Sequence, residues 1–382
     1  MSQLLGLFLK LGITAFGGPA AHIAMLEDEV VTRRRWLTRE RFLDLLGATN
    51  LIPGPNSTEM AIHIGFVRGG VPGLVVAGLS FILPAALITL GFAWAYVRFQ
   101  AVPQADALLY GIKPTVIAII GTAVWRLGKT AAKNRTLLGL GTLVMLAVLL
   151  GVNEIAALLG GGLVGMLWQF RRRWGKKGTG TPLFLGAFSF PAGSVAITAT
   201  TATPTVPLLS IGLFFLKIGC VLFGSGYVLV AFLQGGLVEQ YRWLTQQQLL
   251  DAIAIGQFTP GPVLTTATFI GYVLAGLPGA AVATFCIFAP SFLFVLISNP
   301  LIPRMRQSAL MSAFLDAVNA SAIGLMAAVA VELARSTLTD WGAWGIALGA
   351  AVALLRYKAN SAWLVLGGGA VGWLLKTTVV GG

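Results

Sequence analysis

The chain has 382 residues, of which 57% are hydrophobic and 10% are charged. Soluble domains carry about 25% charged residues, so the composition excludes a soluble, secreted, fibrous or DNA-binding protein. Residues 252–303 contain no charged side chain, and about 20 apolar residues are enough to cross a bilayer. The formal charge of +13 comes from basic residues that flank apolar segments, as in membrane proteins with a basic cytoplasmic face. We therefore expect an all-α, polytopic membrane protein.

The second half of the chain repeats the first at an offset of 207 residues. The sequence FLKLG at 8–12 returns as FLKIG at 215–219, and RWLT at 35–38 returns at 242–245. We expect two homologous repeats, 1–175 and 208–382. They are joined over 176–207 by a basic and then Thr/Pro-rich linker, for which a further membrane crossing is the alternative.

In chain order, the first half predicts apolar spans over 4–26, 42–66, 70–97, 107–127, 136–151 and 154–170. The second span is interrupted at 53–57 by a Pro-Gly-Pro sequence that cannot continue a helix. Irregular backbone at membrane depth must be buried in protein. We therefore expect this span to be a re-entrant, broken-helix hairpin, which leaves about five crossings in each half.

The charges of equivalent loops predict that the two repeats are inverted relative to each other. Loop 27–41 holds five arginines, whereas its counterpart holds Arg242 alone. Elsewhere the bias reverses, because Arg98 is matched by Arg304 and Arg306. Since cytoplasmic loops are enriched in Lys and Arg, equivalent loops with opposite bias lie on opposite faces. Inversion requires an odd number of crossings in each half, and five satisfies this requirement. Six crossings in each half would leave the two halves parallel.

Each half contains two breaks that could form a substrate site. In inverted-repeat transporters, broken helices meet near the bilayer midplane and direct their half-helix N-termini at anionic groups. Neutral donors and close backbone approach at these breaks suit a small oxyanion. The alternative is that these residues only pack or kink helices. The candidate binding residues are Gly17, Gly18, Pro53, Gly54, Pro55, Asn56, Ser57 and Thr58, with Gly224, Ser225, Pro260, Gly261 and Pro262 in the second half.

Several charged or titratable residues lie near the breaks. Lys10 and Lys217 are matched lysines in the first span of each half, where they could bind an anion or extend to the membrane interface. Glu59, His63 and His22 are candidates for proton coupling. For Glu59 the alternative is a capping box that begins at Asn56, with His63 as a packed polar residue.

Other functional classes find little support in the sequence. Cys220 and Cys286 lie in apolar stretches, which predicts buried thiols and no disulfide. Neither a metal site nor a cofactor is expected, because the chain has no Cys/His cluster, nucleotide loop or nucleophile–base pair. An integral-membrane enzyme is therefore disfavoured, and a passive channel remains a further option. The expected partners are an oxyanion and the lipid bilayer, without nucleic acid, and the sequence allows a homodimer.

The sequence FGGP at 16–19, the arginine-rich loop that ends in RWL, and PGPNST at 53–58 together resemble the chromate transporter family. The resemblance covers both halves and corresponds to the long, two-domain form. It implies a secondary transporter of the bacterial inner membrane that exports chromate, confers chromate resistance and takes sulfate as a competing analogue. A sulfate uptake carrier is the alternative. The second half departs from the pattern at Ser225 and Gly226, so we expect the first half to contribute more to binding.

Overall fold

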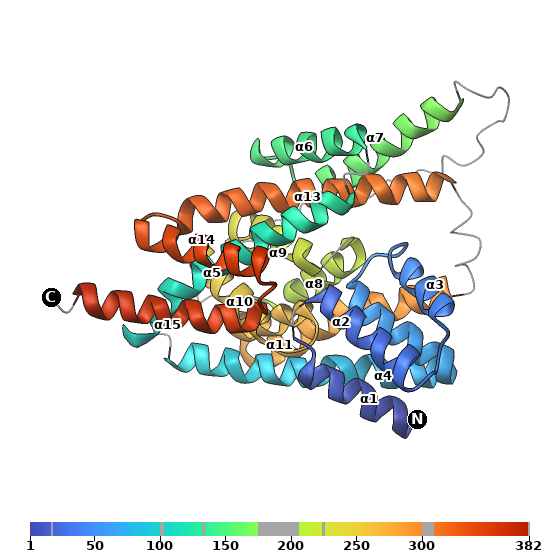
Figure 1. Cartoon of the computed structure of the whole chain (residues 1–382), viewed down its shortest axis with the longest axis horizontal. Coiled ribbons are helices and arrows are strands. Elements are labelled where there is room, and N and C mark those ends of the chain that lie inside the picture. Colours follow the sequence, from blue (N-terminus) through green and yellow to red (C-terminus); the bar gives the residue numbers. More distant parts are fainter. Residues whose placement is uncertain are drawn as a thin grey trace.

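The computed structural model describes residues 1–16, 18–99, 103–131, 134–174, 206–223, 226–299 and 309–380 (Figure 1). Every regular element in these ranges is a helix. The linker expected over 176–207 therefore lies almost wholly outside the described residues. The first half contains α1 (Ser2–Thr14), α2 (Pro19–Glu27), η1 (Asp28–Arg33), α3 (Arg39–Thr49), α4 (Asn56–Phe99), α5 (Pro103–Ala131), α6 (Arg135–Leu149) and α7 (Glu154–Trp174).

The second half has the same order of elements. It contains α8 (Leu208–Val221), η2 (Gly226–Val228), α9 (Leu229–Leu233), η3 (Gln234–Gln240), α10 (Gln246–Phe258), η4 (Val263–Thr265), α11 (Thr266–Ser298), α13 (Ala309–Thr337), α14 (Trp341–Arg356) and α15 (Ser361–Val380). Even the π-helical η1 has a counterpart, η3, at the matched position. The internal repeat of the sequence is thus a repeat of helices.

The long helix α4 doubles back on itself near its first third. Gly69 and Gly70 leave the helical conformation, and Gly70 has a φ of 57°. A Cβ added to Gly65 would lie 2.4 Å from the carbonyl oxygen of Gly73, so the two arms touch through bare backbone. We call residues 56–68 the short arm of α4 and residues 71–99 its long arm. The same turn divides α11 at Ala275 and Gly276 into a short arm (266–274) and a long arm (277–298).

The first apolar segment also doubles back, which differs from the single span expected over 4–26. Lys10 in α1 forms an ion pair of 2.8 Å with Glu29 in η1. At about 1.5 Å per helical residue, these side chains could not meet if α2 continued in the direction of α1. The chain therefore forms a hairpin, because the break at residues 15–18 lets α2 and η1 return alongside α1.

The segment interrupted by the Pro-Gly-Pro sequence forms a second hairpin. Trp36 precedes α3, and Arg68 ends the short arm of α4. The guanidinium carbon of Arg68 lies 5.0 Å from the centre of the Trp36 ring, so α3 and the short arm run antiparallel. Arg68 thus stacks on Trp36 at the end of the bundle.

The two halves pack against each other through equivalent helices. The long arms of α4 and α11 are antiparallel, because Gly78 lies against Phe292 while Leu74 shares an apolar cluster with Val295. Helix α5 packs on α15 and α13 packs on α7, so the last helices of each half contact the other half (Figure 1). A Cβ on Gly111 of α5 would fall 1.9 Å from the carbonyl oxygen of Gly368.

Four helical segments are long and apolar enough to cross a membrane, namely 56–99, 107–129, 263–298 and 311–337. Shorter apolar helices accompany them, and large apolar side chains such as Leu87 and Trp363 are exposed on the outer surface. A surface of this kind is stable in lipid and not in water. The described helices thus form a multi-pass membrane protein.

Candidate functional site

The breaks of the two halves meet in pairs. The amide of Gly54 donates a hydrogen bond of 2.6 Å to the carbonyl oxygen of Leu222. The amide of Gly261 donates one of 2.8 Å to the carbonyl oxygen of Ala15. We call the contact between Gly54 and Leu222, together with the Pro53–Pro55 turn, the first junction. We call the contact between Gly261 and Ala15, together with the Pro260–Pro262 turn, the second junction. Each Pro-Gly-Pro turn is thus held by the break that follows α1 or α8 in the other half.

Glycine is required at the centre of both turns. Gly54 has a φ of 144° and Gly261 a φ of 84°, which side chains with a Cβ rarely adopt. A Cβ on Gly261 would lie 2.6 Å from the Cβ of Ala85. A Cβ on Gly54 would lie 2.0 Å from Oε1 of Glu59 and 2.8 Å from Oγ of Ser291. The space beside Gly54 is therefore taken by two polar side chains.

The first turn of α4 presents free backbone donors at the first junction. Its first backbone hydrogen bonds run from the amides of Thr58 and Glu59 to the carbonyl oxygen of Pro55. The amides of Asn56 and Ser57 precede these bonds and so lack an acceptor within the helix. These two amides, together with the positive end of the helix dipole, favour an anion.

The capping-box alternative for Glu59 is wrong. The amide group of Asn56 donates to Oδ1 of Asn50 at 2.8 Å, so Asn56 belongs to the turn and does not cap α4. The Glu59 side chain is fully buried, and neither of its oxygens has a hydrogen-bond partner in the described part of the chain. The structure thus places a carboxyl group beside the neutral donors of the Pro53–Pro55 turn.

Other buried polar atoms near the first junction also lack partners among the described residues. They are Oγ1 of Thr58, Nε2 of His63 and Oγ of Ser291. Nδ1 of His63 lies 3.3 Å from the amide nitrogen of Asn299, and His63 forms no hydrogen bond with Glu59. Unsatisfied buried polar groups are costly, so a cluster of them marks a place where a polar ligand or water binds.

His22 closes the break between α1 and α2. Its Nε2 lies 3.0 Å from the carbonyl oxygen of Ala15, and its Nδ1 lies 3.5 Å from the hydroxyl of Ser57. A neutral ring with its proton on Nε2 satisfies both contacts, since Nδ1 then accepts from Ser57. His22 therefore connects the second junction, through Ala15, to the start of α4.

The two threonines that follow the Pro260–Pro262 turn are paired within the second junction. Thr265 donates to the carbonyl oxygen of Pro262 and accepts from Thr89 at 3.2 Å. Thr266, which matches Glu59 in the repeat, donates to the carbonyl oxygen of Val263 at 2.8 Å. Near the second junction, Nε2 of the buried Gln257 lacks a partner among the described residues, whereas at the first junction both oxygens of Glu59 and the hydroxyls of Thr58 and Ser291 do.

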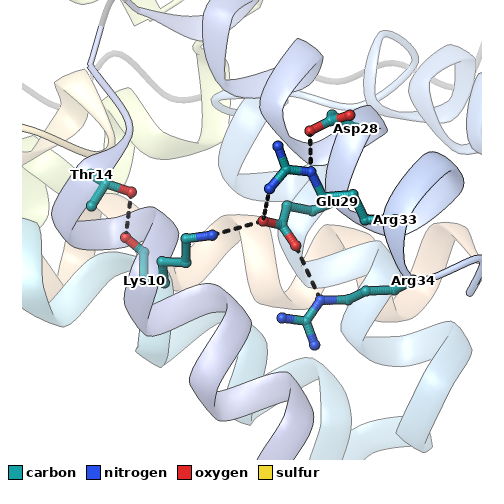
Figure 2. A network of polar contacts seen from close by, with 6 residues as sticks. All are labelled: Lys10, Thr14, Asp28, Glu29, Arg33 and Arg34. Carbon is teal, nitrogen blue, oxygen red and sulfur yellow. Dashed lines mark hydrogen bonds and ion pairs between the residues drawn. The ribbon is translucent and has the colours of Figure 1, made fainter.

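Lys10 lies in an ion-pair network and not at a junction. Figure 2 shows its ammonium group pointing to Glu29, which also contacts Arg34 at 3.1 Å and Arg33 at 3.6 Å. The hydrogen bond from Lys10, and then that from Arg34, lower the pKa of Glu29 below its usual range. Lys217 is exposed and has Gly236 in the place of a matched glutamate. The ammonium group of Lys10 is therefore engaged by Glu29, whereas a binding role for Lys217 stays a prediction.

Some predicted residues fall outside the described ranges, and some contacts were not predicted. Gly17, Gly224 and Ser225 are outside the described residues. Gly18 has a φ of 82°, and a Cβ there would lie 2.7 Å from the hydroxyl oxygen of Tyr227 in the other half. Sequence reasoning missed Tyr227 and Ser291. The only signals were their positions, Tyr227 directly after the second-half break and Ser291 directly after the repeated proline at 290.

Within the described ranges, no group of three or more His, Cys, Asp or Glu side chains could hold a metal ion. Cys220 and Cys286 are free thiols, but Cys220 is exposed and Cys286 half-buried, so the predicted burial is wrong for Cys220. The junctions therefore offer amides, hydroxyls and one carboxyl group as their chemistry.

The fold and the junctions define a multi-pass membrane protein of two helical repeats whose broken helices meet in pairs. The family model described as chromate transporter matches residues 2–166 and 209–373. The chain belongs to the chromate transporter family.

Curated relatives agree over nearly the whole length. A chromate transport protein of Cupriavidus metallidurans is 36% identical over 97% of this chain and 92% of its own. A probable chromate transport protein of Synechococcus elongatus is 34% identical over 89% of this chain and 86% of its own. A chromate transport protein of Pseudomonas aeruginosa is 33% identical over 98% of this chain and 92% of its own. These relatives are named as transport proteins and not as enzymes. No solved structure matches the chain.

Proposed function

We propose that the protein is a secondary active transporter that exports chromate across the bacterial inner membrane and thereby confers chromate resistance. Membership of the chromate transporter family supports the substrate class. The cluster of unpartnered polar atoms at the first junction is the observation that carries the site, since it lies where the two halves meet. Sulfate is the competing analogue, because it shares the charge and tetrahedral shape of chromate.

The oxyanion binds at the first junction in this proposal. The amides of Asn56 and Ser57 point out of the first turn of α4, and the hydroxyls of Thr58 and Ser291 are buried beside them. Such donors recognise an oxyanion without a permanent positive charge. The second junction, whose Thr265 and Thr266 are already paired, supports the first by fixing Ala15 and, through His22, Ser57. Lys10, which is paired with Glu29, is given no binding role here, and a binding role for Lys217 stays a prediction.

The repeats are inverted in the membrane in this proposal, and the packing of the long arms supports it. Two equivalent helices that run antiparallel across a bilayer belong to units of opposite orientation. Met1 contacts Gly69, and Trp36 stacks with Arg68, so the N-terminus and loop 27–41 share one end of the bundle. This end carries the five arginines of that loop, which makes it the cytoplasmic face.

The hairpins change the expected number of crossings. In this proposal, the hairpin of α1 and α2 returns to the membrane face where it started, and so does the hairpin of α3 and the short arm of α4. Neither hairpin crosses the membrane, so each half has fewer than five full crossings. Trp174, the end of α7, and Leu208, the start of α8, then lie at opposite ends of the bundle. Antiparallel packing of α7 on α13 and parallel packing of α8 on the long arm of α11 support this placement. The domain limits 1–175 and 208–382 are retained.

Alternating access follows from this arrangement, because the site lies at the contact between two units that can rock against each other. The alternative function is sulfate uptake by the same fold. It is kept because amide and hydroxyl donors bind either oxyanion and do not set the direction of transport.

Labelled chromate uptake into everted membrane vesicles tests the proposal. We expect uptake that requires energisation and is inhibited by excess sulfate. Gly54→Leu and Asn56→Leu should abolish uptake while membrane expression is kept. Gly6→Leu is the matched control, because a side chain at Gly6 meets no neighbour within 4 Å.

Two outcomes contradict parts of the proposal. Uptake that is unchanged in both junction variants would remove the site. Sulfate-inhibited chromate entry into right-side-out vesicles, with none into everted ones, would turn the function to import.

A further inference from the structure

Glu59 is the one carboxyl group at the junctions of the described chain, and its surroundings decide its charge. The side chain is fully buried, and both oxygens lack hydrogen-bond partners among the described residues. Oε1 of Glu59 and Oγ of Ser291 both lie beside Gly54, within 2.0 and 2.8 Å of the position of a Cβ, so they are less than 5 Å apart. An ionised carboxylate in such a place would be an uncompensated buried charge.

The groups that face Glu59 do not supply a balancing cation. From α11 it meets the hydroxyl of Ser291, and from the turn it meets the backbone of Gly54. On α4 itself the nearest polar groups are Thr58 and, one turn further on, His63. Arg41 of α3 acts electrostatically on His63, and not on Glu59. Among the described residues, no salt bridge reaches Glu59.

A carboxyl group beside an oxyanion must change its protonation for both to occupy the site. If Glu59 were ionised, it would repel a dianion held by the amides of Asn56 and Ser57. If it is protonated, its hydroxyl becomes a donor and adds to the same set of donors. Binding of the dianion and binding of a proton to Glu59 therefore strengthen each other.

We propose that Glu59 is the proton-binding site of the carrier and that one proton travels with each oxyanion. The proton is taken from water at the face where the oxyanion loads and is released with it at the other face. The loaded site then moves a net charge of −1 in place of −2, so export is driven by a membrane potential that is negative inside, while an inward-directed proton gradient opposes it. This proposal rests on the proposed function, because it requires the oxyanion to bind at the first junction.

The second junction supports a count of one proton. Thr266 occupies the position that matches Glu59, and its hydroxyl already donates to Val263. His22 keeps both ring nitrogens in contact with Ala15 and Ser57, so it can serve both contacts as a neutral ring. His63 has an unpartnered Nε2, so His63→Gln is included in the test as a competing proton carrier.

Proton uptake on binding is measured first with the purified full-length protein in weakly buffered alkaline solution, with sulfate and chromate as the probes. We expect about one proton to be taken up for each oxyanion bound by the wild type and by Glu59→Asp. Glu59→Gln should bind the oxyanion without proton uptake, since its amide resembles the protonated carboxyl group. Glu40→Gln, which makes the same change at an exposed carboxylate of α3, should behave as the wild type.

Transport in proteoliposomes provides the second measurement. With one proton per oxyanion, a tenfold proton gradient should shift the steady-state chromate ratio about tenfold in the wild type. In Glu59→Gln the same gradient should leave that ratio unchanged, while chromate exchange continues.

The outcomes separate the two proposals. Oxyanion binding by the wild type without proton uptake, or proton uptake that persists in Glu59→Gln, overturns the role of Glu59. Loss of uptake in His63→Gln alone would assign the proton to His63 instead. Absence of any oxyanion binding by the wild type would instead contradict the proposed function.

Discussion

The amide of Gly54 and the carbonyl oxygen of Leu222 are 2.6 Å apart, although the two residues belong to different repeats. The matched pair, Gly261 and Ala15, makes the same contact at 2.8 Å with the roles of the halves exchanged. Each half therefore completes a turn of the other. A chain cut to a single repeat would leave a buried amide and a buried carbonyl group unpaired at the place where a ligand is expected.

The second junction depends on close backbone approach, and this can be tested with Gly261→Ala. The added Cβ would meet the Cβ of Ala85 at 2.6 Å, and the φ of 84° is itself unfavourable for alanine. We expect a loss of about 1–3 kcal/mol in the free energy of unfolding. Thermal unfolding in detergent measures it. Adding Ala85→Gly should restore part of the loss, and a double variant no more stable than Gly261→Ala would show that the contact is not the cause.

Ser291→Ala should separate binding from stability. Because its hydroxyl is buried without a partner among the described residues, removing it should leave the melting temperature unchanged or slightly raised. The same change should weaken chromate transport through KM by about two- to tenfold, the value of one hydrogen bond. Ser321→Ala is the control, since that hydroxyl donates to Ala317 at 2.8 Å. An unchanged KM would exclude Ser291 from the site.

The network around Glu29 should make stability depend on pH. Lys10 and Arg34 lower the pKa of Glu29 in the folded protein. The contribution of Glu29 to the free energy of unfolding is therefore complete above its unfolded-state pKa of about 4.3. It is lost as the pH falls through the lower folded-state pKa. Glu29→Gln should therefore destabilise the protein near neutral pH and flatten the stability profile in acid, as followed by thermal unfolding. The double variant with Lys10→Glu and Glu29→Lys, which exchanges the two charges, should be more stable than either single variant.

The ion pair between Lys113 of α5 and Asp251 of α10 joins the two halves away from the junctions. The atoms are 3.5 Å apart, and the side chain of Asp251 is 2% exposed and also accepts from Tyr96. Lys113→Met should cost about 3–5 kcal/mol, because it leaves a buried carboxylate without its cation. Lys113→Met combined with Asp251→Asn should be more stable than Lys113→Met alone. Equal stabilities of these two variants would show that the pair is not coupled.

Accessibility labelling tests the inverted arrangement. Single cysteines at Arg135, the start of α6, and at Thr339, just before α14, would be introduced after replacing Cys220 and Cys286 with alanine. A membrane-impermeant maleimide should label the two positions from opposite faces of oriented vesicles, since they are equivalent ends of inverted repeats. Labelling of both from one face would indicate parallel repeats.

The sequence determined the class of this protein. Composition predicted a helical membrane protein, and the 207-residue offset predicted two repeats, because hydropathy and internal similarity can be read directly along the chain. The Pro-Gly-Pro breaks were predicted for a local reason as well, since proline cannot continue a helix. The two proline turns do interrupt helices in both halves.

Only the tertiary structure decided which groups meet. The sequence allowed Glu59 to cap α4 and Lys10 to bind an anion. Among the described residues, however, Glu59 has no hydrogen-bond partner beside Gly54, and Lys10 pairs with Glu29. The doubling back of α1 and α2 was missed for the same reason. A break shows that a helix ends but not in which direction the chain leaves it. That direction is fixed by contacts between residues far apart in the sequence, such as the amide of Gly261 with Ala15, and no local pattern encodes such pairings.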